Sequence, residues 1–307
     1  MFFFPYRIDL DLRYIPYLTI AVCLLCIVIF LAQLRSNFHY EDATSNFCGS
    51  LDRVTILVLR GVGHSTEGNP CVSVFGDIRK ADNADLKIHE MSLASMNLNF
   101  YEDRNDEIVF IEGTLKSAFL QYQMMVPQDL TTNFAYEPLN MRVWTMLTST
   151  FSHGSWDHLI FNLIFFYAFA AAIEVILGSR AFCEIIVLMA VTTSLAYSYS
   201  VADDLTAPPT VGLSGVVMGM LALLAVLMPR ARICCFAWFI VFFKVFRIPA
   251  IFLALWYVGW DLLAYNSEED TNVNYMAHIS GAVTGVVVGL CLWMFGRDLL
   301  TRIDKAG

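Results

Sequence analysis

Charged residues are scarce in this chain of 307 residues, since Asp, Glu, Lys and Arg make up 15% of it while hydrophobic residues make up 57%. A soluble fold of this length has too little interior to hide so much apolar surface, so lipid is the expected solvent. Positive charge is scarcer than negative charge, with 19 Lys and Arg against 28 Asp and Glu. The basic residues are scattered at segment ends. Nucleic acid is therefore excluded as a partner, because phosphate binding needs clustered basic residues.

Metal-ligand clusters are also missing. The one CxxC spacing, Cys23-Leu24-Leu25-Cys26, lies within an apolar run, and no Cys/His pair has the spacing of a metal site, so we expect neither a metal nor another cofactor. Six cysteines lie in apolar runs and are interpreted as small buried hydrophobic residues. Cys48 and Cys71 lie in the one long polar stretch, and whether they form a disulfide depends on that stretch facing an oxidising compartment. The sequence leaves that pairing open.

Long apolar runs account for most of the chain. A hydrocarbon core of about 30 Å is crossed by roughly 20 apolar residues. Six runs of this kind lie at 15–34, 157–177, 181–201, 211–228, 247–265 and 276–295. The first has no small-x-small cleavage site and is interpreted as an uncleaved membrane helix. The sequence thus predicts an all-α polytopic membrane protein with a six-helix bundle, in which Ile233–Phe243 is an interfacial or partly re-entrant piece.

Basic residues predict the orientation, because Lys and Arg are retained on the cytoplasmic side. They precede the first run, separate the second from the third, and follow the fourth and sixth: Arg7, Arg13, Arg180, Arg230, Arg232, Arg297, Arg302 and Lys305. The alternate loops are acidic, with Asp203, Asp204, Glu268, Glu269 and Asp270. We therefore expect both termini in the cytoplasm. In a bacterial host the membrane would be the cell inner membrane, and a secretory-pathway membrane fits the same charges.

The chain is predicted to have three parts: an N-terminal tail with the first span (1–36), an outer insertion (37–125) and a core (126–307). Short alternating runs separated by Gly, Asn and Asp mark the insertion, at Val54–Leu59, Val72–Phe75 and Ile108–Ile111. This pattern predicts a small β-rich or mixed domain. The stretch from Met141 to Trp156 mixes apolar residues with Ser, Thr and Arg, which indicates an element at the membrane interface.

Ser214 and His278 are the strongest candidates for catalysis. Ser214 lies three residues past Val211 in a run that goes from outside to inside, and His278 lies two residues past Met276 in another run that enters from outside. The two side chains are thus expected at similar depth on one side of the membrane. A serine is a poor nucleophile until a neighbouring base takes its proton, and neutral His is the residue best matched to that task.

Glycines at four-residue spacing are expected to bring the two runs together. Gly215 and Gly219 lie on one, and Gly281, Gly285 and Gly289 on the other. Small residues at this spacing let helix backbones approach closely. His278 precedes Gly281 by three residues and so shares its stripe, which would bring the imidazole against the facing helix.

His158 and Asn162 are candidates for stabilising an oxyanion. They are four residues apart on one predicted helix and so share a face. Together with the backbone N–H of Ser214 near a helix N-terminus, both could donate to a tetrahedral intermediate. Each feature also has a structural explanation: a Ser in a Gly-rich helix is often a packing residue, and His278 could be a satisfied structural histidine. Glu174 is assigned a structural bond to a loop or backbone group.

The order of these motifs resembles the rhomboid intramembrane proteases. The run 151–162, Phe-Ser-His-Gly-Ser-Trp-Asp-His-Leu-Ile-Phe-Asn, looks like the family's His-containing start of the second helix, and Glu174-x-x-x-Gly178 follows it. Then come Gly212-x-Ser214-Gly215 with Gly219, and Ala277-His278-x-x-Gly281-x-x-x-Gly285. The resemblance covers residues 141 to 295.

This resemblance implies a Ser214/His278 dyad without an acidic third member, with His158, Asn162 and the Ser214 backbone as the oxyanion hole. Arg142 and Trp144 look like the family's Trp/Arg pair in reversed order, and Arg142 is given a structural role. Met218 stands where many members have an aromatic residue that packs on the histidine. The long insertion has no counterpart in the resemblance.

The implied activity is hydrolysis of a peptide bond in or next to a membrane-spanning helix. The substrate proteins would enter sideways from lipid beside the fifth helix, at a gate formed by Phe161, Trp256 and Trp260. A catalytically inactive rhomboid-like adaptor that binds transmembrane helices is the alternative, but such proteins typically lack the Ser or the His, and this chain has both. A transporter is disfavoured because no paired charges lie at mid-membrane depth.

Overall fold

The computed structural model describes residues 2–9, 14–63, 69–81, 83–96, 98–204, 206–239, 242–267 and 273–295. The chain divides into two compact units. We call Met1–Gln33 together with Thr131–Gly307 the membrane unit, and Leu34–Leu130 the insertion unit. The first helix, α1 (Tyr17–Ser50), begins in the former and ends in the latter.

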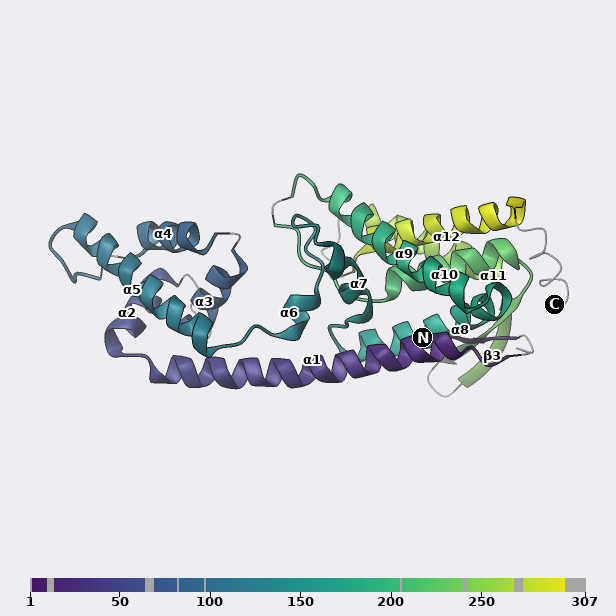
Figure 1. Cartoon of the computed structure of the whole chain (residues 1–307), viewed down its shortest axis with the longest axis horizontal. Helices are drawn as coiled ribbons and strands as arrows, with labels where there is room; N and C mark the ends of the chain where they lie inside the picture. The colour runs from purple at the N-terminus through teal and green to yellow at the C-terminus, as the bar shows by residue number, and fades with distance from the viewer. Residues whose placement is uncertain are drawn as a thin grey trace. The chain divides into compact units, whose positions relative to one another are not determined.

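The membrane unit has a helix at each of the six predicted spans (Figure 1). After α1 these are α8 (Trp156–Leu177), α9 (Ser179–Ser200), α10 (Ser214–Leu227), α11 (Ala250–Tyr265) and α12 (Tyr275–Phe295). Among the described residues, α1, α8, α9 and α12 are long and apolar enough to cross a membrane, whereas α10 and α11 are apolar but have only 14 and 16 residues. The chain is therefore a multi-pass membrane protein, in which four described helices are long enough to cross and α10 and α11 fall short of a full span.

Helix α10 forms the centre of the membrane unit and packs against α8, α9, α11 and α12. Its sequence is apolar on every face, and its residues from Gly215 to Ala225 are all buried. A helix that is hydrophobic all round is stable only where other elements surround it.

A three-stranded antiparallel sheet adjoins these helices, with strand order β1-β2-β3. The strands are β1 (Phe2–Ile8), β2 (Arg232–Phe239) and β3 (Phe242–Pro249). The piece at Ile233–Phe243, predicted to be interfacial or partly re-entrant, lies in β2 and the start of β3, where its aromatic and β-branched residues pair as a hairpin. The ring of Phe4 in β1 lies 6.4 Å from that of Phe161 in α8.

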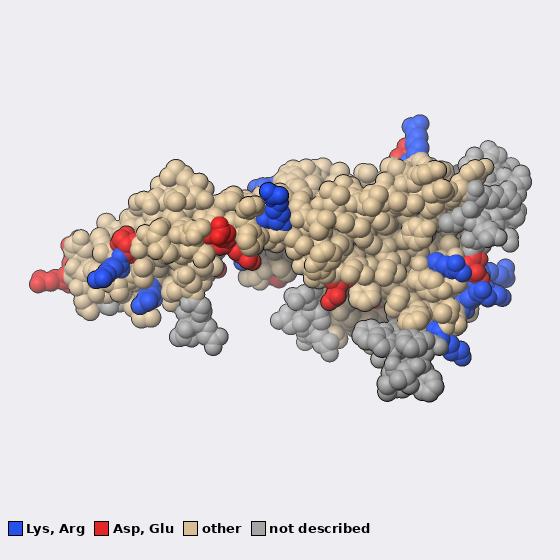
Figure 2. All heavy atoms as spheres, turned by 90° about the horizontal axis from the view of Figure 1, so that it is seen from below, with Lys and Arg blue, Asp and Glu red and all other residues tan. Residues whose placement is uncertain are grey.

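Basic side chains gather where the sheet lies, while the flanks of the helices are largely uncharged (Figure 2). Arg232, Lys244 and Arg247 are exposed there, and Arg247 pairs with Asp9 at 2.8 Å. Several residues that predicted the orientation lie outside the described residues: Arg13, Glu268, Glu269, Asp270, Arg297, Arg302 and Lys305.

The described part of the insertion unit is helical, so the β-rich or mixed prediction was wrong. Its helices are α2 (Arg53–Val62), α3 (Pro70–Lys80), α4 (Ala84–Ala94) and α5 (Arg104–Met125). The runs interpreted as strands lie within α2, α3 and α5. Side-chain oxygens of four N-cap residues accept from the first turns of these helices: Asp52, Asn69, Asn83 and Asp103. Such caps favour helix starts over strands.

An aromatic core holds the insertion unit together. Phe47, Phe75 and Tyr122 are almost fully buried, and the Phe75 and Tyr122 rings stack at 5.1 Å. Cys48 and Cys71, whose pairing the sequence left open, form a disulfide that joins the end of α1 to the start of α3. A disulfide of this kind stabilises chiefly by restricting the unfolded chain.

Candidate active site

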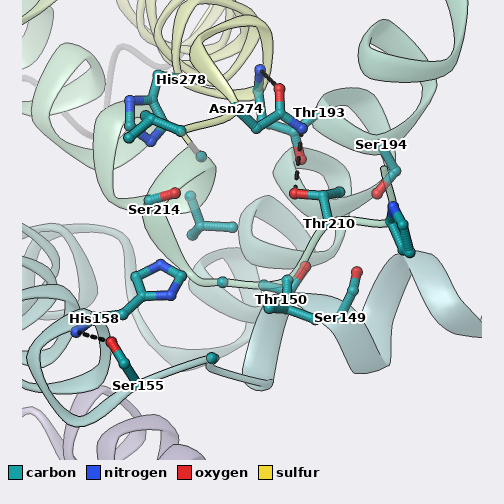
Figure 3. A pocket seen from close by; sticks show the side chains of 18 residues that line it. Ser149, Thr150, Ser155, His158, Thr193, Ser194, Thr210, Ser214, Asn274 and His278 are labelled. Carbon is teal, nitrogen blue, oxygen red and sulfur yellow. Dashed lines mark hydrogen bonds between the residues drawn. The ribbon is translucent and has the colours of Figure 1, made fainter. Parts of the chain in front are cut away.

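A cavity of about 610 Å³ lies where α8, α10 and α12 begin and α9 ends (Figure 3). Ser214, His158 and His278 project into it from three different helices. Much of the remaining wall is polar, with the hydroxyl groups of Ser149, Thr150, Ser155, Thr193, Ser194 and Thr210. This polar space, built from the ends of apolar helices, can hold water and a peptide group.

Ser214 is the first residue of α10. The preceding residue, Leu213, occupies the N-cap position and provides no side-chain hydrogen bond to the helix. The first N–H groups of any helix have no partner within the helix, and they carry the positive end of its dipole. The hydroxyl of Ser214 therefore lies beside backbone donors that can bind negative charge.

Gly212 sets the turn that leads into α10. Its φ of +132° lies in a region that favours glycine, and a Cβ there would come within 2.6 Å of the His158 ring. Its N–H donates to the carbonyl oxygen of Ser149 at 2.9 Å, which ties the turn to α7 (Val143–Phe151). A side chain at position 212 would therefore displace His158 from the cavity.

The glycine stripes of α10 and α12 lie against each other. A Cβ on Gly281 would overlap the carbonyl oxygen of Gly215, and one on Gly285 would overlap that of Gly219. The backbones can approach this closely only because both stripes lack side chains. The contact places the first turn of α12, with His278, beside the first turn of α10, with Ser214.

Asn274 fixes the start of α12, a role that the sequence analysis missed. Its Oδ1 accepts from the N–H of Ala277 at 3.0 Å, and its Nδ2 donates to Oγ1 of Thr210 at 3.3 Å (Figure 3). The second bond joins α12 to the loop before α10. The signal in the sequence was an Asn three residues before Ala277, the spacing of a helix cap.

His278 has an acidic partner that neither the sequence nor the resemblance indicated. Its Nδ1 lies 3.2 Å from Oδ2 of Asp261 in α11. Both side chains are largely buried, with 17% of His278 and 11% of Asp261 exposed. The resemblance implied a dyad without an acidic third member, and this contact places a carboxylate within hydrogen-bond reach of its histidine. The available signal was a carboxylate within an apolar run, which is costly in a membrane and functional by default.

The two oxyanion candidates are placed differently. His158 lines the cavity, and its backbone N–H donates to Oγ of Ser155, the N-cap of α8, at 3.2 Å. The side chain of Asn162 is turned to its own helix, where its Nδ2 donates to the carbonyl oxygen of His158 at 2.8 Å. The neighbouring His153 ring is buried, and burial together with His158 lowers its pKa to about 3. A neutral His153 thus packs beside His158, at 5.1 Å between ring centroids.

Glu174 and Arg142 lie away from the cavity. The buried carboxylate of Glu174 accepts from the N–H groups of Leu18 and Thr19 and from Oγ1 of Thr19, at 2.7–2.9 Å. It thereby caps α1 from α8. Arg142 precedes α7, and its Nη2 and Nε donate to the side-chain oxygen of Asn140, at 3.1 and 3.2 Å, when that amide is turned toward them. Neither Glu174 nor Arg142 lines the cavity.

The three aromatic gate candidates are exposed on the outside of their helices. Phe161 on α8 is 42% exposed, and Trp256 and Trp260 on α11 are 63% and 62% exposed. Between these helices the rings of Phe165 and Tyr257 meet edge to face at 5.8 Å. The gate residues therefore face the surroundings of the unit and do not reach the cavity.

Fold and site together define a helical membrane protein with a Ser/His cavity at the ends of its helices. The family model of the rhomboid domain matches residues 140–295, which contain every residue assigned to the cavity. The chain belongs to the rhomboid family. That membership supports the site residues only as candidates, because family members share a fold more widely than an activity.

Three curated relatives are similar to this chain over about half of its length. RHOMBOID-like protein 12, mitochondrial, of Arabidopsis thaliana is 26% identical over 55% of this chain and 53% of its own. Rhomboid protease GlpG of Haemophilus influenzae is 28% identical over 50% of this chain and 72% of its own. Rhomboid protein 1, mitochondrial, of Saccharomyces cerevisiae is 27% identical over 56% of this chain and 45% of its own. The chain thus spans about half the length of two of these relatives and 72% of the third.

Proposed function

We propose that this chain is an intramembrane serine endopeptidase that hydrolyses a peptide bond in or next to the transmembrane helix of a substrate protein. The observation that carries the proposal is the convergence of Ser214, His278 and His158 on one polar cavity from α10, α12 and α8. The similarity to a relative named as a rhomboid protease adds support. Neither a metal nor another cofactor takes part in the proposed chemistry.

The proposed reaction is acyl transfer. Oγ of Ser214 attacks the scissile carbonyl carbon while Nε2 of His278 takes the hydroxyl proton, and the carbonyl oxygen becomes an oxyanion. His278 then gives the proton to the leaving amine as the C–N bond breaks. Water attacks the resulting acyl-enzyme with His278 again as the base, which releases the second product and restores Ser214.

Donors for the oxyanion are proposed to come from two elements. The N–H groups at the start of α10 lie beside Ser214, and the ring of His158 projects into the same cavity. Asn162 can contribute only after its amide leaves the carbonyl oxygen of His158. Losing one such donor typically costs about 10² to 10³ in kcat, so His158 is expected to matter more than Asn162.

We propose that the cavity faces the outer side of the membrane and that both termini are cytoplasmic. The cavity lies at the start of α10, whereas exposed cations lie in the sheet that follows the end of α10. Basic residues are retained on the cytoplasmic side. Substrate helices would approach from lipid along α11, where Trp256 and Trp260 are exposed.

A fluorophosphonate probe tests the proposal directly, because it reacts with an activated serine. The purified full-length chain in detergent should be labelled on Ser214, and Ser214→Ala should not. Ser149 and Ser155 also line the cavity and should remain unlabelled, because the proposal assigns the base His278 to Ser214 alone. Absence of label on a folded wild-type chain would favour the alternative, an inactive rhomboid-like adaptor that binds transmembrane helices.

A further inference from the structure

Asp261 is a carboxylate within an apolar helix. It lies between Trp260 and Leu262 in the last part of α11, and the residue as a whole is 8% exposed. A charged group in this position is costly, and it is retained where a specific partner compensates for the lost water. Among the described residues, the one nitrogen of a His, Lys or Arg within 4.0 Å of its carboxylate is Nδ1 of His278.

The contact determines which nitrogen of His278 carries the proton. A neutral imidazole has one N–H, and a carboxylate can only accept, so a hydrogen bond to Asp261 requires the proton on Nδ1. Nε2 is then left with its lone pair, which is the atom that must accept the proton of Ser214. Without the carboxylate, the imidazole is free to adopt the other tautomer, whose Nε2 cannot act as a base.

The same contact fixes the ring. His278 lies in the first turn of α12, and the edge of its ring meets the Tyr275 ring with the centroids 6.3 Å apart. Asp261 makes a polar contact with the ring from a second helix. This contact restricts rotation of the His278 ring about its Cβ–Cγ bond. When His278 takes the proton from Ser214 it becomes a cation, and a carboxylate at 3.2 Å stabilises that cation.

We propose that Asp261 is a positioning residue for His278: it selects the Nδ1–H tautomer, orients the ring toward Ser214 and stabilises the imidazolium. The inference deepens the proposed protease function and rests on it. Asp261 does not touch the substrate, so it acts on the reaction at Ser214 only through His278.

Kinetics on a transmembrane reporter substrate test this role. Asp261→Asn keeps the shape of the side chain but places an amide N–H toward the imidazole, so kcat should fall by about 10² to 10⁴ while KM changes less than about twofold. Asp261→Glu keeps the carboxylate, so its kcat should be at least about tenfold higher than that of Asp261→Asn. Leu263→Ala, a matched change on the exposed side of α11, should leave kcat unchanged. Retained kcat in a folded Asp261→Asn variant would overturn the proposal.

The tautomer can be measured in the wild-type chain, and a variant is needed only to assign the signal. In full-length chain labelled with ¹⁵N-histidine, the His278 signal is assigned by its loss in His278→Ala, and Nδ1 should be the protonated nitrogen. An Nε2–H tautomer in the wild-type chain would refute the inference. This readout also separates two failures: a chain that neither cleaves nor takes the fluorophosphonate probe would contradict the protease proposal, whereas the tautomer reports on the Asp261–His278 contact alone.

Discussion

The helices of the insertion unit and those of the membrane unit begin in different ways. Each of α2 to α5 starts after an Asp or Asn whose side chain accepts from its first turn. In the membrane unit α8 has such a cap in Ser155, whereas α7, α9, α10 and α11 have no side-chain hydrogen bond from the N-cap residue. A polar cap contributes typically about 1 kcal/mol to a helix, so the insertion unit relies on local bonds that much of the membrane unit does without.

The absence of a cap has a chemical consequence at α10. A Ser, Asp or Asn at position 213 would accept from the N–H groups that follow it, and these donors would no longer be open to a ligand. Leu213 offers these N–H groups no side-chain acceptor, and Ser214, Gly215 and Val216 line the cavity. Capped helix ends add to the stability of the insertion unit, while the proposed activity of the membrane unit depends on a helix end without a cap.

The largest effect is expected from the proposed nucleophile and base. Ser214→Ala and His278→Ala should each abolish cleavage of a transmembrane reporter, because the hydroxyl attacks and the imidazole takes its proton. Rates are measured with purified protein, and melting temperatures near that of the wild type show that the fold is intact. Activity in a purified Ser214→Ala variant would end the serine-protease proposal.

The next effect concerns the donors at the cavity. His158→Ala should lower kcat by about 10² to 10³ with little change in KM, because an oxyanion donor acts mainly on the transition state. Asn162→Ala should lower kcat less, since its amide is bonded to the carbonyl oxygen of His158. A larger loss at Asn162 than at His158 would show that the amide turns into the cavity during catalysis.

A smaller effect, on stability, is expected at the contact between α10 and α12. Gly281→Ala should destabilise the membrane unit by about 1–3 kcal/mol, because the added Cβ would overlap the carbonyl oxygen of Gly215. Gly259→Ala on α11 is the matched control, since no atom outside its own helix backbone and chain neighbours lies within 4 Å of its would-be Cβ. Thermal unfolding in detergent compares the two, and equal melting temperatures would mean that the helices can separate without cost.

The six helices of the membrane unit were predictable because each is an apolar run of nearly membrane length. The insertion unit was not, because Val54–Leu59 and Val72–Phe75 are too short for periodicity to distinguish a strand from a helix. The caps at Asp52 and Asn69, the latter followed by Pro70 at a helix start, were the signal that favoured helices. The hairpin at Ile233–Phe243 escaped prediction for the same reason, since a short apolar run fits a strand as well as other structures.

The sequence predicted those residues of the candidate site that belong to a motif on a single helix, and it did not predict contacts between helices. Ser214, His158 and His278 belong to recognisable patterns, and the structure places all three on one cavity. Asp261 belongs to no pattern in the sequence, because its partner lies 17 residues away on another helix. Only the packing of α11 beside α12 brings the two together, and hydropathy does not predict which faces meet.

The smallest expected effect is a pH dependence of stability in the insertion unit. Glu107 is buried in α5, where its carboxylate accepts from the N–H groups of Leu98 and Phe100 and from Arg104, at 2.8–3.1 Å. Burial alone would raise the pKa of Glu107, but the bonds from Phe100, Arg104 and Leu98 hold it below its usual range. A lowered pKa in the folded state means that the stabilisation is present above the unfolded value of about 4.3 and is lost as pH falls through the folded value.

Acid should therefore loosen the insertion unit before it affects the membrane unit. Hydrogen exchange of α5 in the full-length chain, corrected for the intrinsic pH dependence of exchange, should show protection falling between about pH 5 and pH 3. Glu107→Gln should already be less protected at pH 6 and should lose little more in acid, because its amide does not titrate. The exposed neighbour Asp106 provides the matched control, Asp106→Asn, which should behave like the wild type. If Glu107→Gln lost as much protection in acid as the wild type, the charge on Glu107 would not be what holds the start of α5 to the preceding loop.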